Sequence, residues 1–91
     1  MKIEQSPSFK RDFKRLRKKN YNMDKLKLAV EAIVSADVKN LSTKYKDHSL
    51  KGNWRGYREL HIEGDWLLIY KVDNQRIVLT LTRTGSHDEL L

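Results

Sequence analysis

The chain has 91 residues and no cysteine, which excludes a disulfide framework or a thiolate zinc cluster and favours one domain over 1–91 in a reducing, cytoplasmic setting. Its 19 Lys and Arg against 12 Asp and Glu give a formal net charge of +7, which favours nucleic acid as the partner, although an anionic membrane surface or an acidic protein fits the same charge. The first residues lack the apolar stretch of a secretory signal and the longest apolar run, 66–70, is too short to span a bilayer, so we expect a soluble protein with no membrane contact.

The first half of the chain predicts a short strand followed by two helices. Residues 2–5 are extended in character, with Ile3 as the one core candidate. Ser6 before Pro7 is typical of a helix N-cap and first turn, and an apolar stripe at helical spacing follows it, made of Phe9, Phe13 and Leu16. After turn residues at 20–22, a second such stripe ends near residue 37, with members Leu26, Ala29, Val30, Ile33 and Val34. Together these segments predict a two-helix hairpin.

Basic side chains fill most other positions of the first helix. We expect five of them to bind RNA phosphates: Lys10, Arg11, Lys14, Arg15 and Lys18. A solvated helix face without a ligand is the alternative, but few acidic residues balance this run, and we therefore favour phosphate contact.

The second half predicts a loop and a sheet. Residues 38–53 are polar and irregular, and Gly52 marks a turn. Strands are expected over 54–62, 65–72 and 76–84, joined by tight turns at 63–64 and 73–74, and Gly85 is expected to break the last strand before a tail or helical turn at 86–91. The prediction is an α+β fold in which an antiparallel sheet, made of the N-terminal strand and a C-terminal three-stranded meander, packs against the N-terminal two-helix hairpin.

All three histidines, His48, His61 and His87, lie in this second half, near Asp65 and Arg83. Strand alternation places His61 on the face away from the helices, and Asp65 lies across a tight turn from it. Histidine and aspartate can take the proton of a ribose 2′-hydroxyl and give one to the departing 5′-oxygen, while an arginine stabilises charge on the phosphate. The basic first half and this cluster together suggest RNA cleavage without a metal or other cofactor.

Each of these residues also has a structural explanation that does not require catalysis. Asp65 is also suited to stabilise its turn, and His48 to form a local hydrogen bond in the loop. Arg83 could simply pair with an acidic neighbour, Glu59 or Asp65. Trp66, like the other tryptophan, suits a sheet core as well as a base-stacking position. A metal site is disfavoured, because the histidines and aspartate lack the short spacing of common zinc motifs.

The chain resembles the YafQ family of bacterial toxins, which belongs to the RelE superfamily, in two runs, 45–70 and 83–87. The first run contains the segment His-x-Leu-x-Gly-x-Trp-x-Gly-Tyr-Arg at 48–58. The resemblance implies a RelE-like fold and a ribosome-dependent endoribonuclease that enters the vacant decoding site and cuts messenger RNA. It also implies a cognate antitoxin that inhibits the enzyme, and binding to operator DNA only through that antitoxin. By position, it also implies an acid–base set of His48, His61, Asp65 and His87. Trp66 and Arg83 match flanking positions that orient RNA or stabilise phosphate charge, whereas Leu91 stands where some relatives have an aromatic residue.

Two other functions fit parts of the sequence. A toxin homologue without catalysis could bind nucleic acid or act in regulation with its antitoxin, because the basic surface alone would serve that role. A relative that poisons DNA gyrase shares the scaffold, but the retained histidines and aspartate argue against it.

Overall fold

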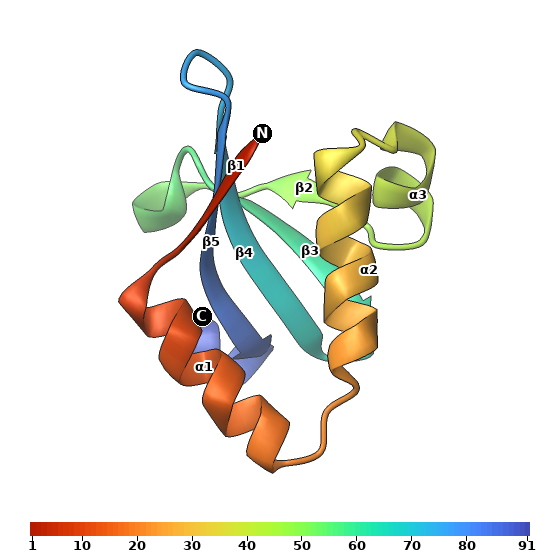
Figure 1. Ribbon diagram of the computed structural model, residues 1–91, viewed down its shortest axis with the longest axis vertical. Coiled ribbons are helices and arrows are strands. Elements are labelled where there is room, and N and C mark those ends of the chain that lie inside the picture. The colour runs from red at the N-terminus through yellow and green to blue at the C-terminus, as the bar shows by residue number, and fades with distance from the viewer.

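The computed structural model describes all residues, 1–91, and contains ten elements built around one sheet (Figure 1). In chain order they are β1 (Lys2–Gln5), α1 (Pro7–Lys18), α2 (Met23–Val34), α3 (Val38–Thr43), β2 (His48–Ser49), the 3-10 turn η1 (Gly52–Trp54), β3 (Arg58–Glu63), β4 (Trp66–Asp73), β5 (Val78–Ser86) and α4 (His87–Leu90). The α+β class is therefore confirmed.

The sheet is mixed, with the strand order β1-β5-β4-β3-β2. The predicted meander is confirmed, because β3, β4 and β5 pair antiparallel in succession. The prediction of an entirely antiparallel sheet is wrong at β1, which pairs parallel to β5 from Lys2 opposite Val78 to Gln5 opposite Leu81. The short strand β2, which was not predicted, pairs antiparallel to β3 at the other edge.

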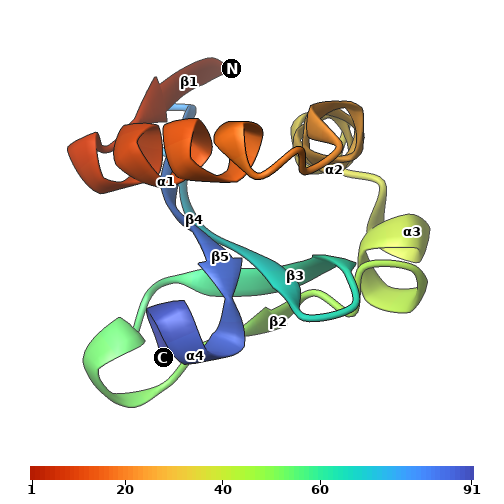
Figure 2. The same ribbon diagram turned by 90° about the horizontal axis from the view of Figure 1, so that it is seen from below.

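Helix α1 begins as the sequence predicts, since the Ser6 hydroxyl accepts a hydrogen bond from the Phe9 amide at 3.0 Å and Pro7 occupies the first turn. Both α1 and α2 cover the same face of the sheet (Figure 2). They do not pack as a hairpin, because their apolar stripes turn toward the sheet: α1 contacts mainly β5, and α2 contacts β3 and α3. Leu16 and Leu26 meet in one core cluster beneath the two helices.

Several predicted boundaries are wrong for reasons of backbone conformation. The 38–53 segment contains α3, and Trp54 lies in η1, because positive φ angles at Gly52 (64°) and Gly56 (92°) delay strand β3 until Arg58. A φ of 56° at Ile77 likewise delays β5 until Val78. Gly85 does not break β5, since it pairs with Leu67 inside the ladder. The predicted C-terminal helical turn is present as α4.

The two faces of the sheet carry separate apolar clusters. The larger cluster lies under α1 and α2 and includes Leu60 and Leu68 from the sheet. The smaller cluster, on the opposite face, joins Leu67 and Ile69 of β4 to Leu90 of α4, with Leu50, Trp54 and Tyr57 packed against it. Figure 2 shows η1 and α4 on this second face. None of the helices is long and apolar enough to cross a membrane.

Candidate active site

The sheet face opposite α1 and α2, which we call the histidine face, carries the predicted acid–base residues in register. His48 pairs with Glu59, which pairs with Ile69, which pairs with Arg83, so these four share one row. The next row runs from His61 through Leu67 to Gly85. Because paired residues point to the same side of a sheet, the prediction that His61 faces away from the helices is confirmed.

Glu59 joins two of the histidines. Its Oε2 lies 3.9 Å from His48 Nε2, and its Oε1 lies 3.7 Å from His61 Nε2. The two imidazole centroids are 6.3 Å apart. Glu59 is only 4% exposed, whereas both rings reach solvent. A buried carboxylate therefore orients two accessible imidazoles, an arrangement that suits transfer of protons to and from a bound substrate.

Glu59 was not predicted as a site residue. The available signal was its position: it lies two residues before His61 in a strand that alternates, so it had to share that face. Its burial and its second contact, to His48, depend on β2, which the sequence did not predict.

His48 is held by its neighbours on both sides. Its Nδ1 donates to the Lys46 carbonyl at 3.0 Å, which is the local hydrogen bond expected for a loop histidine and which leaves Nε2 directed toward Glu59. The preceding residue, Asp47, accepts hydrogen bonds from Arg58 Nε at 2.6 Å and from the Tyr70 hydroxyl. Arg58 also donates to Ser49 Oγ at 2.9 Å. These anchors fix both ends of β2.

The Asp47 cluster also shifts the ionisation of its partners. Burial, together with the hydrogen bond to Asp47, raises the pKa of Tyr70. Burial opposes the charge of Arg58, but the hydrogen bond to Asp47 outweighs it and raises the pKa of Arg58. The Arg58 guanidinium therefore stays charged and the Tyr70 phenol stays neutral at neutral pH, which are the forms that donate to Asp47.

Asp65 and His87 meet at the ends of their strands. The Asp65 Oδ1 accepts a hydrogen bond from the His87 amide at 3.2 Å, so Asp65, at the end of the β3–β4 turn, holds the start of α4. A capping box between Ser86 and Glu89 closes the same helix turn. Since Leu90 packs on Leu67, α4 and His87 belong to the histidine face. All four members of the predicted acid–base set thus adjoin this face.

Arg83 binds neither Glu59 nor Asp65, so that expectation is wrong. Its Nε and Nη2 donate to Asp12 of α1 at 2.7 and 3.1 Å. Asp12 also accepts from the Thr84 amide at 3.1 Å, because β1 ends opposite Leu81 and leaves this edge of β5 unpaired. Burial opposes ionisation of Asp12, but the hydrogen bonds from Arg83 and Thr84 outweigh it and hold the pKa of Asp12 below its ordinary value. The hydrogen bond to Asp12 raises the pKa of Arg83.

Two residues expected to bind RNA also make contacts inside the protein. Arg15 pairs with Asp12 at 3.0 Å and with Glu89 at 3.1 Å, linking α1 to α4. Trp66 is 5% exposed and donates from Nε1 to Thr84 Oγ1 at 2.9 Å, so its indole is part of the core under the helices. The other four basic residues are exposed on α1, on the side of the sheet opposite the histidines: Lys10, Arg11, Lys14 and Lys18.

The site therefore contains ionisable groups in one accessible region but no cluster that resembles a metal centre. No three His, Cys, Asp or Glu side chains are placed to hold a metal ion together. The groups that remain are proton carriers and cations. Their chemistry is acid–base transfer, with positive charge available for an anionic substrate.

Comparisons with known proteins identify the family and match the fold. Residues 1–91 match the family described as "Bacterial toxin of type II toxin-antitoxin system, YafQ". The chain is 40% identical over 88 residues to the mRNA interferase toxin YafQ of Escherichia coli (strain K12). The matched residues make up 97% of this chain and 92% of that protein. Its fold matches a metal-bound toxin from Helicobacter pylori with a TM-score of 0.90 and 38% identity, over 100% of this chain and 99% of that one. It also matches the toxin in the E. coli DinJ-YafQ complex with a TM-score of 0.85 and 38% identity, over 98% and 96% of the two chains.

Proposed function

This chain belongs to the YafQ family of bacterial type II toxins, and we propose that it is an mRNA interferase, an endoribonuclease that inhibits translation by cutting messenger RNA on the ribosome. The observation that carries the proposal is the convergence of His48 and His61 on Glu59, on a face that substrate can reach. The +7 net charge favours a polyanionic substrate.

The reaction proceeds by attack of a ribose 2′-hydroxyl on the adjacent phosphate. One imidazole of the His48–His61 pair takes the 2′-hydroxyl proton as the new O–P bond forms. The bond from phosphorus to the 5′-oxygen breaks, and a second proton carrier of the set, His87 or the other imidazole, protonates that oxygen. The products are a 2′,3′-cyclic phosphate and a 5′-hydroxyl, and the proposed reaction requires no cofactor.

The remaining residues position these groups and neutralise charge. Glu59 holds the two imidazoles, and Asp65 holds His87 through its amide. Arg83 donates hydrogen bonds from Nε and Nη2 to Asp12, while its Nη1 makes no hydrogen bond within the protein. Nη1 can therefore donate to the phosphate oxygens and stabilise the negative charge that develops there. The exposed basic residues of α1 are the proposed contacts to RNA phosphates outside the scissile bond.

The proposed partners follow from the same features. A cognate antitoxin inhibits the enzyme, by analogy with the E. coli DinJ-YafQ complex, and operator DNA is bound only through that antitoxin. Ribosomal RNA is the polyanion that the basic face of α1 meets while messenger RNA lies on the histidine face. The proposed location is the cytoplasm, where ribosomes are.

Cleavage assays on charge-matched variants test the proposal. His61→Ala and Asp65→Ala should each lower cleavage of ribosome-bound message about 100-fold or more and relieve growth arrest, because the first removes a proton carrier and the second removes the acceptor for the His87 amide. Asp88→Ala is the matched control, because it removes the same side chain from an exposed position of α4 that forms no ion pair or side-chain hydrogen bond. Full activity of His61→Ala in a folded protein would refute catalysis at this site.

A further inference from the structure

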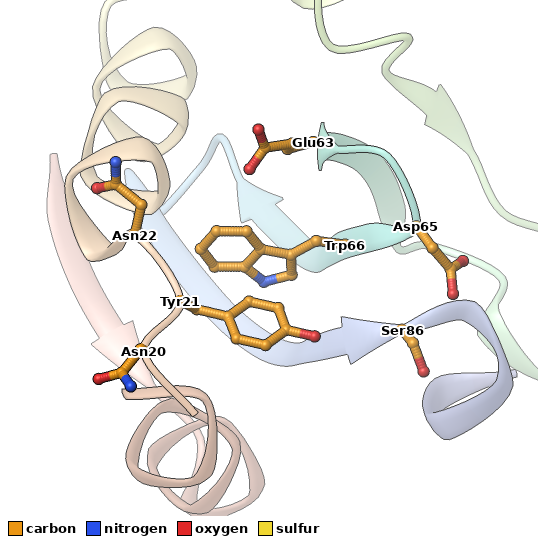
Figure 3. Close-up of a pocket in the computed structure, with 7 residues that line it drawn as sticks. All are labelled: Asn20, Tyr21, Asn22, Glu63, Asp65, Trp66 and Ser86. Atoms are coloured by element: carbon orange, nitrogen blue, oxygen red, sulfur yellow. The ribbon is translucent and has the colours of Figure 1, made fainter. Parts of the chain in front are cut away.

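A second concave region adjoins Asp65 on the helix side of the sheet. It is a pocket of about 380 Å³ between the loop that joins α1 to α2 and the end of the β3–β4 hairpin (Figure 3). Asn20, Tyr21 and Asn22 line it from the loop, and Glu63, Asp65 and Trp66 line it from the hairpin. The mechanism described above uses only Asp65 of these residues.

The inner wall of the pocket is aromatic and rigid. The rings of Tyr21 and Trp66 meet edge to face, with centroids 5.0 Å apart. The indole is fixed by its hydrogen bond to Thr84, and the Tyr21 amide donates to the Leu16 carbonyl at 3.1 Å. Figure 3 shows the phenol ring beside the indole, with its hydroxyl directed toward Ser86. Tyr21 is half-buried, so part of its ring remains open to a ligand.

The rim of the pocket offers polar atoms without partners. Asn22 uses Oδ1 to cap α2 through the Asp24 amide at 3.0 Å, which leaves its Nδ2 group free. Neither the Asn20 amide group nor the Tyr21 hydroxyl forms a hydrogen bond within the protein. Glu63 pairs through Oε1 with Lys25 at 2.5 Å, which leaves Oε2 as an acceptor.

We propose that this pocket binds one unstacked base of the RNA substrate beside the scissile phosphate. The proposal rests on the proposed function and deepens it by assigning a site of base recognition. Single-stranded RNA is recognised by aromatic contact to its bases and by hydrogen bonds to base edges, and the wall and rim supply both. Asp65 belongs to the pocket and to the acid–base set, and Glu63 lies two residues after His61, beyond an irregularity in the pairing of β3 with β4, so the two regions meet at this end of the hairpin.

The rim also predicts which bases fit. The free oxygens of Glu63 and Asp65 only accept hydrogen bonds, and carboxylates accept from exocyclic amino groups such as cytosine N4. Adenine, cytosine and guanine carry such a group, whereas uracil does not. The pocket therefore favours an amino-bearing base over uracil, and the amide groups of Asn20 and Asn22 bind the remaining edge.

The variants for the test remove polar atoms without disturbing the fold. Asn20 has a φ of 63°, and Asn20→Gly deletes the amide while keeping a residue that tolerates this conformation. Glu63→Gln keeps the side-chain size and an oxygen for Lys25 but loses the free carboxylate acceptor. Tyr21→Phe keeps the ring on Trp66 and loses the hydroxyl. Glu31→Gln, at an exposed position of α2 that does not line the pocket and forms no ion pair, is the matched control for charge.

Cleavage should be measured on ribosome-bound messages that differ only in the nucleotide next to the cleaved bond. The wild type should cut messages with an amino-bearing base at least about fivefold faster than the uracil message, and Glu63→Gln should lose this preference while it still cuts the uracil message. Asn20→Gly and Tyr21→Phe should weaken the preference and Glu31→Gln should keep it. An unchanged preference in Glu63→Gln, at wild-type rate, would overturn the pocket and leave the proposed function intact.

A binding measurement separates the pocket from catalysis. The chain has two tryptophans, so the indole N–H resonance of Trp66 reports on the pocket and that of Trp54 serves as an internal control. Cytidine monophosphate should shift the Trp66 signal in the wild type, and uridine monophosphate should shift it less. If neither nucleotide moves the Trp66 signal, the pocket proposal fails whatever the enzyme cleaves. A shift with cytidine monophosphate in a protein that cuts no RNA would support the pocket and refute the proposed function.

Discussion

Replacing Asp12 by alanine should destabilise the protein more than any other single charge removal on α1. Asp12 is 2% exposed and accepts hydrogen bonds from Arg83 Nε, Arg83 Nη2, Arg15 Nη1 and the Thr84 amide, at 2.7, 3.1, 3.0 and 3.1 Å. Alanine removes every acceptor at once. Arg83 and an edge amide then lose their partner between α1 and β5, and Arg15 keeps only Glu89.

The magnitude follows from the burial of these groups. Removing one partner of a buried ion pair costs about 3–5 kcal/mol. Both arginine side chains are partly solvated, so water recovers some of this loss, and we expect about 2–4 kcal/mol. In a domain of this size each kcal/mol lowers Tm by about 4–8 °C, which predicts a Tm decrease of about 8–32 °C.

Urea unfolding followed by circular dichroism measures the effect directly. Asp24→Ala is the control, because Asp24 is exposed in the first turn of α2 and its removal should cost less than about 1 kcal/mol. A loss for Asp12→Ala no larger than that for Asp24→Ala would refute the reasoning that Asp12 joins α1 to the sheet.

Three further results are expected. Glu59→Gln removes the charge between the imidazoles but keeps the side-chain size, so kcat should fall about 10- to 100-fold with little change in KM; an unchanged kcat would contradict the role of Glu59. The pKa of Asp12 in the folded protein lies below its ordinary value of 3.8, so the Asp12 carboxylate stabilises the fold fully above pH 3.8 and loses this effect as the pH falls through the folded-state pKa. Between about pH 5 and pH 2, the unfolding free energy of the wild type should therefore fall more than that of Asp12→Asn. Equal losses in urea titrations would exclude this contribution. Ile77→Asn should raise the unfolding free energy by about 0.5–1 kcal/mol, because Ile77 is 57% exposed and has a φ of 56°, which asparagine adopts more readily than isoleucine. An unchanged unfolding free energy would mean that the backbone at Ile77 is not strained.

The features that the sequence predicts well are those set by short-range patterns. The Ser6–Pro7 pair marks the start of α1, and alternation in β3 places His61 on the face away from the helices. Both outcomes depend only on neighbouring residues, which a single sequence displays directly.

The features that it misses depend on partners distant in the chain. Alternation reports burial but not strand direction, so nothing in residues 2–5 distinguishes parallel from antiparallel pairing with β5. Asp12 falls at helical spacing from Phe9 and Leu16, on the buried stripe, which was a usable signal for a buried carboxylate. Its partner, Arg83, lies 71 residues away and could not be identified without the fold.

The central claim is that side chains on the histidine face pass protons so that a 2′-hydroxyl attacks the scissile phosphate. A ribosome-bound message with a single 2′-deoxy nucleotide at the mapped cleavage position tests it most directly. The account predicts that this message stays intact at that position, while the all-ribose message is cut. Cleavage of both messages at the same bond and rate would contradict it.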